Sequence, residues 1–188
     1  MSWIQLTIEQ PTKMSKSNTA SYFDPNSEAT KYIINSFQNN FKLFFFFLSK
    51  LPSAAWWSFS VKSCTPYRSE VVIPYGWRTK NPFKSIYFAA LAGAGELSTG
   101  MLAIIAIQNR KDIAMLVLKQ EATFSKKAIG KITFTCEDGQ EVIDVMQRVL
   151  DTGEAVPITM TGIGRNEQEE EVCRVMVTWS FKLRRKRK

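Results

Sequence analysis

Histidine is absent from this sequence of 188 residues. Without an imidazole, the chain cannot form a Ser/His/Asp or Cys/His catalytic arrangement, a histidine-ligated metal site, or a mechanism with histidine as the acid or base. The glycine-rich phosphate-binding motifs GxGxxG and GxxxxGK followed by Ser or Thr are also missing. An enzyme with this sequence would depend on carboxylates, hydroxyls and backbone dipoles.

Cysteine is scarce, and its spacing excludes two further classes of protein. Cys64, Cys136 and Cys173 form no CxxC or other ligand pattern, so the sequence indicates neither a disulfide framework nor a zinc site. We expect three reduced, internal cysteines and no metal or other cofactor. The first residues lack the basic leader, apolar run and cleavage site of a signal peptide, so we expect a cytoplasmic protein.

Positive charge is in excess, with 25 Lys and Arg against 17 Asp and Glu. Six of the basic residues are Lys182 and residues 184–188 at the C-terminus. Such a run could attract nucleic acid or an anionic membrane through phosphate groups, but no aromatic residues are interleaved with it. We therefore interpret residues 184–188 as a solvated basic tail and do not expect it to contact nucleic acid or membranes.

Residues 86–107 form a helix-length apolar segment whose only charged residue is Glu96. Such a segment is either a membrane span or a helix buried on all sides. A charge at mid-membrane costs about 2.5 kcal/mol or more, and a glycine inside a helix costs up to about 1 kcal/mol relative to alanine. The segment contains three glycines, which allow close approach of neighbouring backbone. These features favour a helix wrapped by a sheet.

The remaining chain predicts an added N-terminal helix and several strands. Residues 1–22 are mainly polar and are expected to be a disordered extension, followed by a single domain over residues 23–183. Asp24-Pro25 predicts the start of one long helix or two short ones ending at Pro52. A short amphipathic helix is expected after Gly139. Three antiparallel strand pairs are expected, over residues 58–63 with 68–75, 113–124 with 131–137, and 155–164 with 170–183.

This order of elements implies an α+β fold with a largely antiparallel sheet wrapped around one long central helix. Residues 81–100, NPFKSIYFAALAGAGELSTG, resemble the signature of phenylacetate-degradation-type thioesterases of the hotdog-fold superfamily. That signature runs asparagine, five residues, His-Gly-Gly, and a carboxylate nine residues after the histidine. Both spacings are kept here, but the histidine and both glycines are replaced. The matching positions are Asn81, Tyr87, Phe88, Ala89 and Glu96.

Further stretches resemble the same superfamily. EATFSKKAIGKITFTC, residues 121–136, is similar to its strand, Phe-x-[Lys/Arg] turn and glycine-led strand. Residues 41–63, IPYGWRTKNPF at 73–83, and VTWSF at 177–181 look like an uncharacterised bacterial family of unknown function within it, one with an added N-terminal helix. The resemblance covers residues 41–183 and implies the hotdog fold.

The resemblance also implies a chemistry, in which the buried helix points its N-terminus at a thioester carbonyl. The backbone N–H of Phe88 would stabilise the oxyanion, a contribution of about 3 to 4 kcal/mol that requires no side chain. Glu96 would activate water or act as the nucleophile, and Asn81 would orient the carbonyl or the water. The Phe88 ring would narrow the pocket. Substrate contacts are expected from Tyr87, Ala89, Ser98, Thr99, Arg78, Lys80 and Lys84.

The sequence leaves alternative roles open for several of these residues. Ser98 and Thr99 could hold the Glu96 carboxylate or bond back to their own helix, and Glu96 could be a buried carboxylate satisfied by a dimer partner. Basic residues near the helix could bind the phosphates of coenzyme A or of an acyl carrier protein, or be ordinary surface residues; they are Arg78, Lys80, Lys84, Lys126 and Lys127.

We predict an acyl-thioester hydrolase that forms a homodimer or a dimer of dimers. The alternative is a non-catalytic acyl-binding or assembly domain with the same fold, which the missing His-Gly-Gly favours.

Overall fold

The computed structural model of this chain describes residues 22–108 and 110–184. The predicted disordered extension, apart from Tyr22, and the basic tail beyond Arg184 therefore lie outside the described residues. Arg184 itself is held against the sheet, because its backbone N–H donates to Asp112 O and its Nε donates to Ile113 O.

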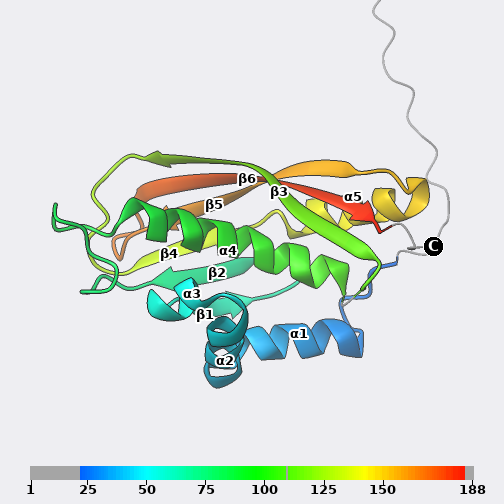
Figure 1. The fold of residues 1–188 in the computed structure, drawn as a ribbon, viewed down its shortest axis with the longest axis horizontal. Helices are drawn as coiled ribbons and strands as arrows, with labels where there is room; N and C mark the ends of the chain where they lie inside the picture. The colour runs from blue at the N-terminus through cyan, green and yellow to red at the C-terminus, as the bar shows by residue number, and fades with distance from the viewer. Residues whose placement is uncertain (1–21, 109, 185–188) are drawn as a thin grey trace, which may run out of the picture.

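Six antiparallel strands form one sheet in the order β1-β2-β4-β5-β6-β3, so that β1 and β3 are its edges (Figure 1). A long helix, α4 (Phe88–Ile107), lies across one face of this sheet. The second helix of the core, α5 (Gly139–Thr152), packs against α4, β5 and β6. This is the hotdog fold that the resemblance implied. The strands are β1 (Ser60–Cys64), β2 (Ser69–Ile73), β3 (Ile113–Phe124), β4 (Ile132–Cys136), β5 (Val156–Arg165) and β6 (Glu171–Leu183).

Helix α4 has apolar residues on every side, and most of them are buried by the rest of the protein. By length and composition it could cross a membrane, yet 72% of its most apolar window is buried inside the protein, which confirms the sheet-wrapped helix. Its glycines allow the close contact. A Cβ on Gly95 would lie 2.5 Å from Val175 Cγ2 of β6, and a Cβ on Gly162 of β5 would lie 2.6 Å from Ser98 Oγ.

Three helices precede the sheet: α1 (Glu28–Gln38), α2 (Asn40–Lys50) and the short α3 (Pro52–Trp56). The prediction of two helices before Pro52 is therefore the correct alternative, and the break falls at Asn39, whose side chain caps α2 by accepting from Lys42 N. The prediction that Asp24 caps the first helix is wrong. Ser27 is the cap, and its hydroxyl accepts from the Thr30 amide. The Asp24 carboxylate instead accepts from the Asn26 amide, in the turn before α1.

The predicted pairing of β3 with β4 is also wrong. Strand β3 pairs with β6 from Ile113↔Leu183 to Phe124↔Cys173, and β4 lies between β2 and β5. The residues that follow β3 are typical of a short turn between neighbouring strands. In the structure, β6 and β5 lie between β3 and β4 in the sheet, so this connection passes two strands. The physical reason is length, because β6 offers β3 a partner along its whole course, whereas β4 has only five residues. The other two predicted strand pairs are confirmed.

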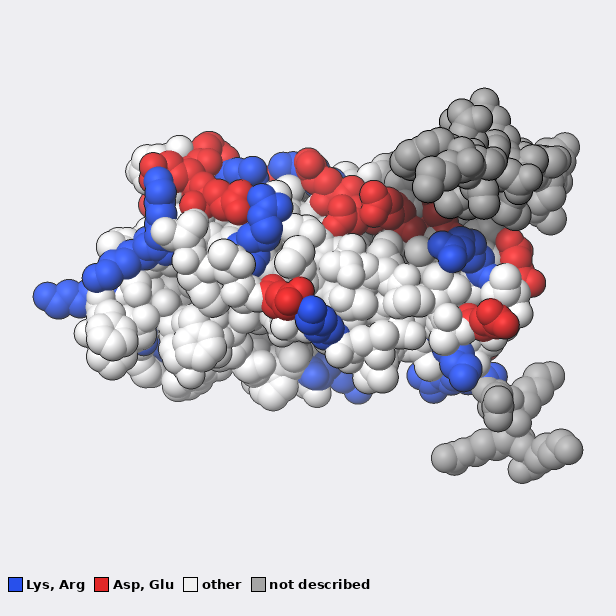
Figure 2. All heavy atoms as spheres, turned by 90° about the horizontal axis from the view of Figure 1, so that it is seen from above, with Lys and Arg blue, Asp and Glu red and all other residues white. Residues whose placement is uncertain are grey.

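Strand β3 leaves one edge of the sheet open. All residues from Leu118 to Phe124 are exposed, which means that both faces of this half of the strand are uncovered. Seen from the side on which β3 lies, the molecule has a broad uncharged area interrupted by a few charged side chains (Figure 2).

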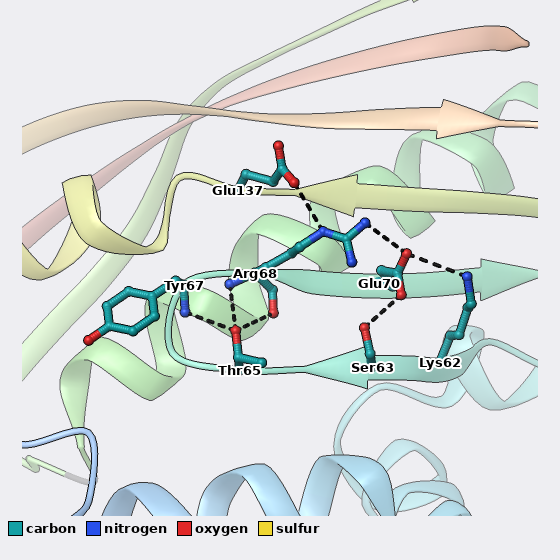
Figure 3. A network of polar contacts seen from close by, with 7 residues as sticks. All are labelled: Lys62, Ser63, Thr65, Tyr67, Arg68, Glu70 and Glu137. Atoms are coloured by element: carbon teal, nitrogen blue, oxygen red, sulfur yellow. Dashed lines mark hydrogen bonds and ion pairs between the residues drawn. The ribbon is translucent and has the colours of Figure 1, made fainter. Parts of the chain in front are cut away.

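A polar cluster fastens the opposite part of the sheet (Figure 3). The buried carboxylate of Glu70 accepts from Ser63 Oγ at 2.6 Å and pairs with Arg68 at 3.0 Å and Lys62 at 3.5 Å. Burial alone would raise the pKa of Glu70, but the hydroxyl and the two cations outweigh it and lower the pKa below its ordinary value. Arg68 also bonds Glu137 beyond β4, so the cluster ties three strands together.

The three cysteines are free and buried, as predicted. Burial raises the pKa of each thiol, in Cys64, Cys136 and Cys173, to about 12. Because the thiolate is the reactive form, these cysteines are structural residues of the core.

Candidate functional site

The start of α4 is an uncapped helix N-terminus. Tyr87 occupies the cap position and makes no side-chain capping bond. Its own N–H donates to Thr79 O at 2.7 Å, and the N–H of Ile86 donates to Ala128 O at 2.9 Å, so the approach to the helix is fixed by its neighbours. The N–H groups of Phe88 and Ala89 have no acceptor within the described part of the chain. These two free donors stand at the positive end of the helix dipole and are suited to an anionic oxygen.

A cleft of about 400 Å³ lies against this helix start. One wall is aromatic, because Phe88 and Phe124 line the cleft with their ring centroids 6.3 Å apart. The Tyr87 ring lies next to that of Phe88, with a centroid distance of 4.9 Å, outside the lining. The structure thus brings Asn81 and Phe88 of the predicted site together. Phe124 was not predicted as a site residue, although it is the phenylalanine of the Phe-x-[Lys/Arg] turn noted in the sequence. The lining also includes Ser85, Leu91, Ser125, Lys126 and Lys127.

The Asn81 side chain shapes the loop that leads into α4. Its Nδ2 donates to Ser85 Oγ at 3.0 Å and to Ile86 O at 3.3 Å, so both amide hydrogens have acceptors. Its Oδ1 accepts from the backbone amides of Phe83 and Ser85. In this arrangement Asn81 positions the helix start and has no free donor for a substrate.

Glu96 is half-buried in the middle of α4, and burial raises its carboxyl pKa above the ordinary value of 4.5. Among the described residues, its carboxylate has no hydrogen-bond or ion-pair partner. The hydroxyls of the two following residues are used elsewhere: Ser98 donates to Gly95 O, and Thr99 donates to Glu96 O while it accepts from Trp179 Nε1. Of the two interpretations of these hydroxyls, the structure favours bonding back to the helix. Both residues are fully buried.

The spacing along α4 limits what one copy of the chain can do. Glu96 comes eight residues after Phe88 in one continuous helix, and at 1.5 Å per residue this separates them by about 12 Å along the axis. An oxyanion donor and a base must each lie about 3 Å from the atoms that react. Phe88 and Glu96 of the same chain therefore do not meet at one carbonyl group.

The predicted basic residues are divided among three regions. Lys126 and Lys127 line the cleft, and Lys126 pairs with Glu170 at 2.6 Å. Arg78 lies apart from that cleft and lines hollows beside α2 and α3.

Lys80 and Lys84 belong to the exposed loop before α4. The backbone of Lys80 forms an isolated antiparallel β-bridge with Ile86, and Lys84 has a positive φ of 58°. Within residues 22–108 and 110–184, no three Cys, Asp or Glu side chains are grouped so as to hold a metal ion.

Comparisons with known proteins agree with this fold. A family model described as a domain of unknown function, DUF4442, matches residues 42–181. No curated protein matches the chain. A Chlorobaculum tepidum protein of unknown function is 13% identical with a TM-score of 0.66, over 77% of this chain and 94% of that one.

Two further solved structures are named as thioesterases. A Pseudomonas aeruginosa protein, described as of unknown function and a probable thioesterase, is 16% identical with a TM-score of 0.63, over 82% of this chain and 96% of that one. A Haemophilus influenzae thioesterase is 14% identical with a TM-score of 0.50, over 72% and 86%. At such identities the likeness shows a shared fold.

Proposed function

The chain belongs to the DUF4442 family, and from its hotdog fold we propose that it hydrolyses acyl thioesters of coenzyme A or of an acyl carrier protein. The observation that carries this proposal is the pair of free N–H groups of Phe88 and Ala89 at the start of α4, where Phe88 lines a cleft. Two similar structures are named as thioesterases, one of them as probable, which supports the same class of reaction. We further propose that the protein acts in the cytoplasm.

The proposed site is formed by two copies of the chain. Because Phe88 and Glu96 are about 12 Å apart along one helix, the carboxylate that serves one helix start comes from the second copy. The two copies can pair through the open β3 edge. Leu116 and Leu118 are 64% and 56% exposed on this strand of 12 residues. A long apolar edge is a surface on which another strand pairs. We therefore propose at least a homodimer joined through β3.

In the proposed reaction, the thioester oxygen binds at the Phe88 amide while Glu96 of the other copy accepts a proton from water. The resulting hydroxide attacks the carbonyl carbon, and the negative charge develops on the oxygen that the helix N-terminus stabilises. The C–S bond then breaks, and the proton returns from Glu96 to the thiolate. The products are a carboxylic acid and a free thiol.

We propose roles for the other predicted residues from their positions around the cleft. The rings of Tyr87, Phe88 and Phe124 would contact the acyl group, and Ala89 contributes the second N–H donor. Lys127 is available for a substrate phosphate, because it has no ion-pair partner in the described part of the chain and lies in the same cleft. Ser98 and Thr99 would support the helix around Glu96.

A second candidate function is binding of an acyl group without turnover. Two observations favour it: the Phe88 and Phe124 rings narrow the cleft, and the Asn81 amide is used within its own loop. Thioester turnover separates the two functions.

The test is thiol release from short, long and aromatic acyl-coenzyme A thioesters by the parent chain, Glu96→Gln and Glu141→Gln at equal folded concentration. Glu141 is an exposed carboxylate on α5 and serves as the matched control. Loss of a general base predicts a decrease in kcat/KM of about 100-fold or more for Glu96→Gln only. Absence of turnover by the parent would favour acyl binding, and equal activity of the parent and Glu96→Gln would overturn the mechanism.

A further inference from the structure

Helix α2 has a second apolar stripe that faces away from the protein. Leu43 and Phe47 are the residues that it buries. The outward stripe consists of Phe41, Phe44, Phe45 and Leu48, at the spacing i, i+3, i+4, i+7 that defines one helix face, and these side chains are 73%, 49%, 51% and 54% exposed. We call these four residues the α2 outer face.

The α2 outer face is continuous with other apolar surface. Phe41 and Phe45 also line an apolar cleft of about 520 Å³ between α1, α2 and Ile104 of α4. On the other side, Phe44 and Leu48 line a hollow with Trp56, which is 54% exposed and contacts the exposed Trp77 ring at 5.4 Å. An exposed apolar surface of this extent marks a contact with another molecule or a membrane.

The unpaired charges beside this surface are positive. Residues 29–69 contain five basic residues and no Asp or Glu, and three of the five pair with acidic residues just outside that range, Lys31 with Glu28 and both Lys62 and Arg68 with Glu70. Lys42 and Arg78 line the hollows beside the α2 outer face, and neither of them has an ion pair among the described residues. Lysine and arginine can extend their charged ends to headgroups while their stems lie along apolar surface.

From these observations we propose that the α2 outer face docks on an anionic lipid bilayer, with its aromatic side chains in the interfacial region and Lys42 and Arg78 at the phosphates. A helix with Phe and Leu on one side and basic side chains beside them is suited to the membrane interface. A second copy of the chain fits poorly, because it would bring like charges together. The docking face is also remote from β3, since α1 and α2 lie at the β1 edge of the sheet (Figure 1). The proposal does not depend on thioester hydrolysis.

The test is cosedimentation of the full chain with vesicles of phosphatidylcholine alone or mixed with phosphatidylglycerol. We expect binding to the mixed vesicles that falls by about tenfold or more in Phe41→Ser/Phe45→Ser, because each side chain withdraws apolar area from water. In Lys42→Gln/Arg78→Gln the binding should fall by about 30-fold, since each basic side chain near an anionic surface strengthens binding about fivefold.

Two controls make the outcome specific. Ile129→Ser removes a residue that is 56% exposed on a loop outside α1–α3, and Lys131→Gln removes a cation outside the docking face; both should bind like the parent. Binding to neither vesicle would overturn the proposal. So would equal binding by the parent and the two-phenylalanine variant, which would assign the attraction to basic residues elsewhere. Self-association that depends on Phe41 and Phe45 without vesicle binding would assign the face to a protein partner instead.

Discussion

Glu96 is a carboxylate in the middle of a helix that is otherwise free of charge, and its surroundings make ionisation unfavourable. Burial raises its pKa, and no described side chain offers it a cation or a hydrogen bond. A base in such a place is expected to be strong for a carboxylate, because the proton that it accepts relieves the cost of the buried charge. At neutral pH, burial of the ionised Glu96 carboxylate therefore lowers the free energy of unfolding.

At the residue scale, this cost predicts that Glu96→Gln gains stability relative to the parent as pH rises. A raised folded-state pKa means that the favourable contribution of the protonated group is complete below the unfolded pKa and is lost as pH rises through the folded pKa. The two proteins should therefore melt at similar temperatures near pH 4, and Glu96→Gln should melt higher at pH 8. Each 1 kcal/mol corresponds to about 2 to 4 °C for a chain of this size.

The measurement is thermal unfolding of both proteins over that pH range, with Glu141→Gln as the exposed control. If Glu96→Gln melted below the parent at pH 8, the carboxylate would be held by a favourable contact, such as one from a dimer partner. The pH profile of thiol release by the parent gives a second readout, because activity should rise with pH through a pKa above 4.5.

At the element scale, α4 can lie against β5 and β6 because glycines stand where the backbones approach. Gly95 leaves no room for a methyl group, since a Cβ there would lie 2.5 Å and 2.6 Å from two atoms of Val175. Both partners are fixed in regular elements, so the contact cannot be relieved by moving a flexible side chain. The glycines of this helix reflect packing, in spite of their low helix propensity.

We therefore expect Gly95→Ala to lower the free energy of unfolding by about 1 to 3 kcal/mol through overpacking, although alanine is the better helix former. The matched control is Gly76→Ala, because a Cβ on Gly76 meets nothing within 4 Å. Urea unfolding of both variants measures the difference. A Gly95→Ala protein as stable as the parent would mean that α4 can shift away from β6 at little cost.

At the scale of the whole molecule, two apolar surfaces lie at opposite ends of the strand order. The β3 edge is the proposed subunit contact, and the α2 outer face beside β1 is the proposed membrane contact. This separation allows both contacts at the same time. It also allows each to be removed without the other.

We expect Leu118→Lys to weaken self-association by at least about tenfold, or 1.4 kcal/mol, because it places like charges near the middle of a β3–β3 contact. Leu48→Lys is the matched control, since the two leucines are 56% and 54% exposed. Sedimentation velocity measures the assembly, and thiol release should fall together with the dimer if two copies form the site. Unchanged assembly in Leu118→Lys would place the subunit contact elsewhere.

The buried helix, most strands and the limits on the chemistry could be predicted from local patterns in the sequence. The lack of histidine limits the chemistry, and the uncharged segment around Glu96 specifies a buried helix because its apolar residues have no polar side. Periodicity located most strands and the N-terminal helical region before Pro52, because hydrophobic spacing follows the geometry of each element; the break at Asn39 was seen only in the structure. The lone charge in that segment identified Glu96, and the resemblance to the thioesterase signature identified Phe88.

Which distant segments meet depends on packing between elements, which local patterns do not encode. The tertiary structure paired β3 with β6, because a long strand is best satisfied by an equally long partner that lies far along the chain. It used the Asn81 amide within its own loop, and it put Arg78 beside α2, away from the cleft at Phe88. It left the outer face of α2 uncovered, because burial depends on which side of a helix the rest of the chain reaches.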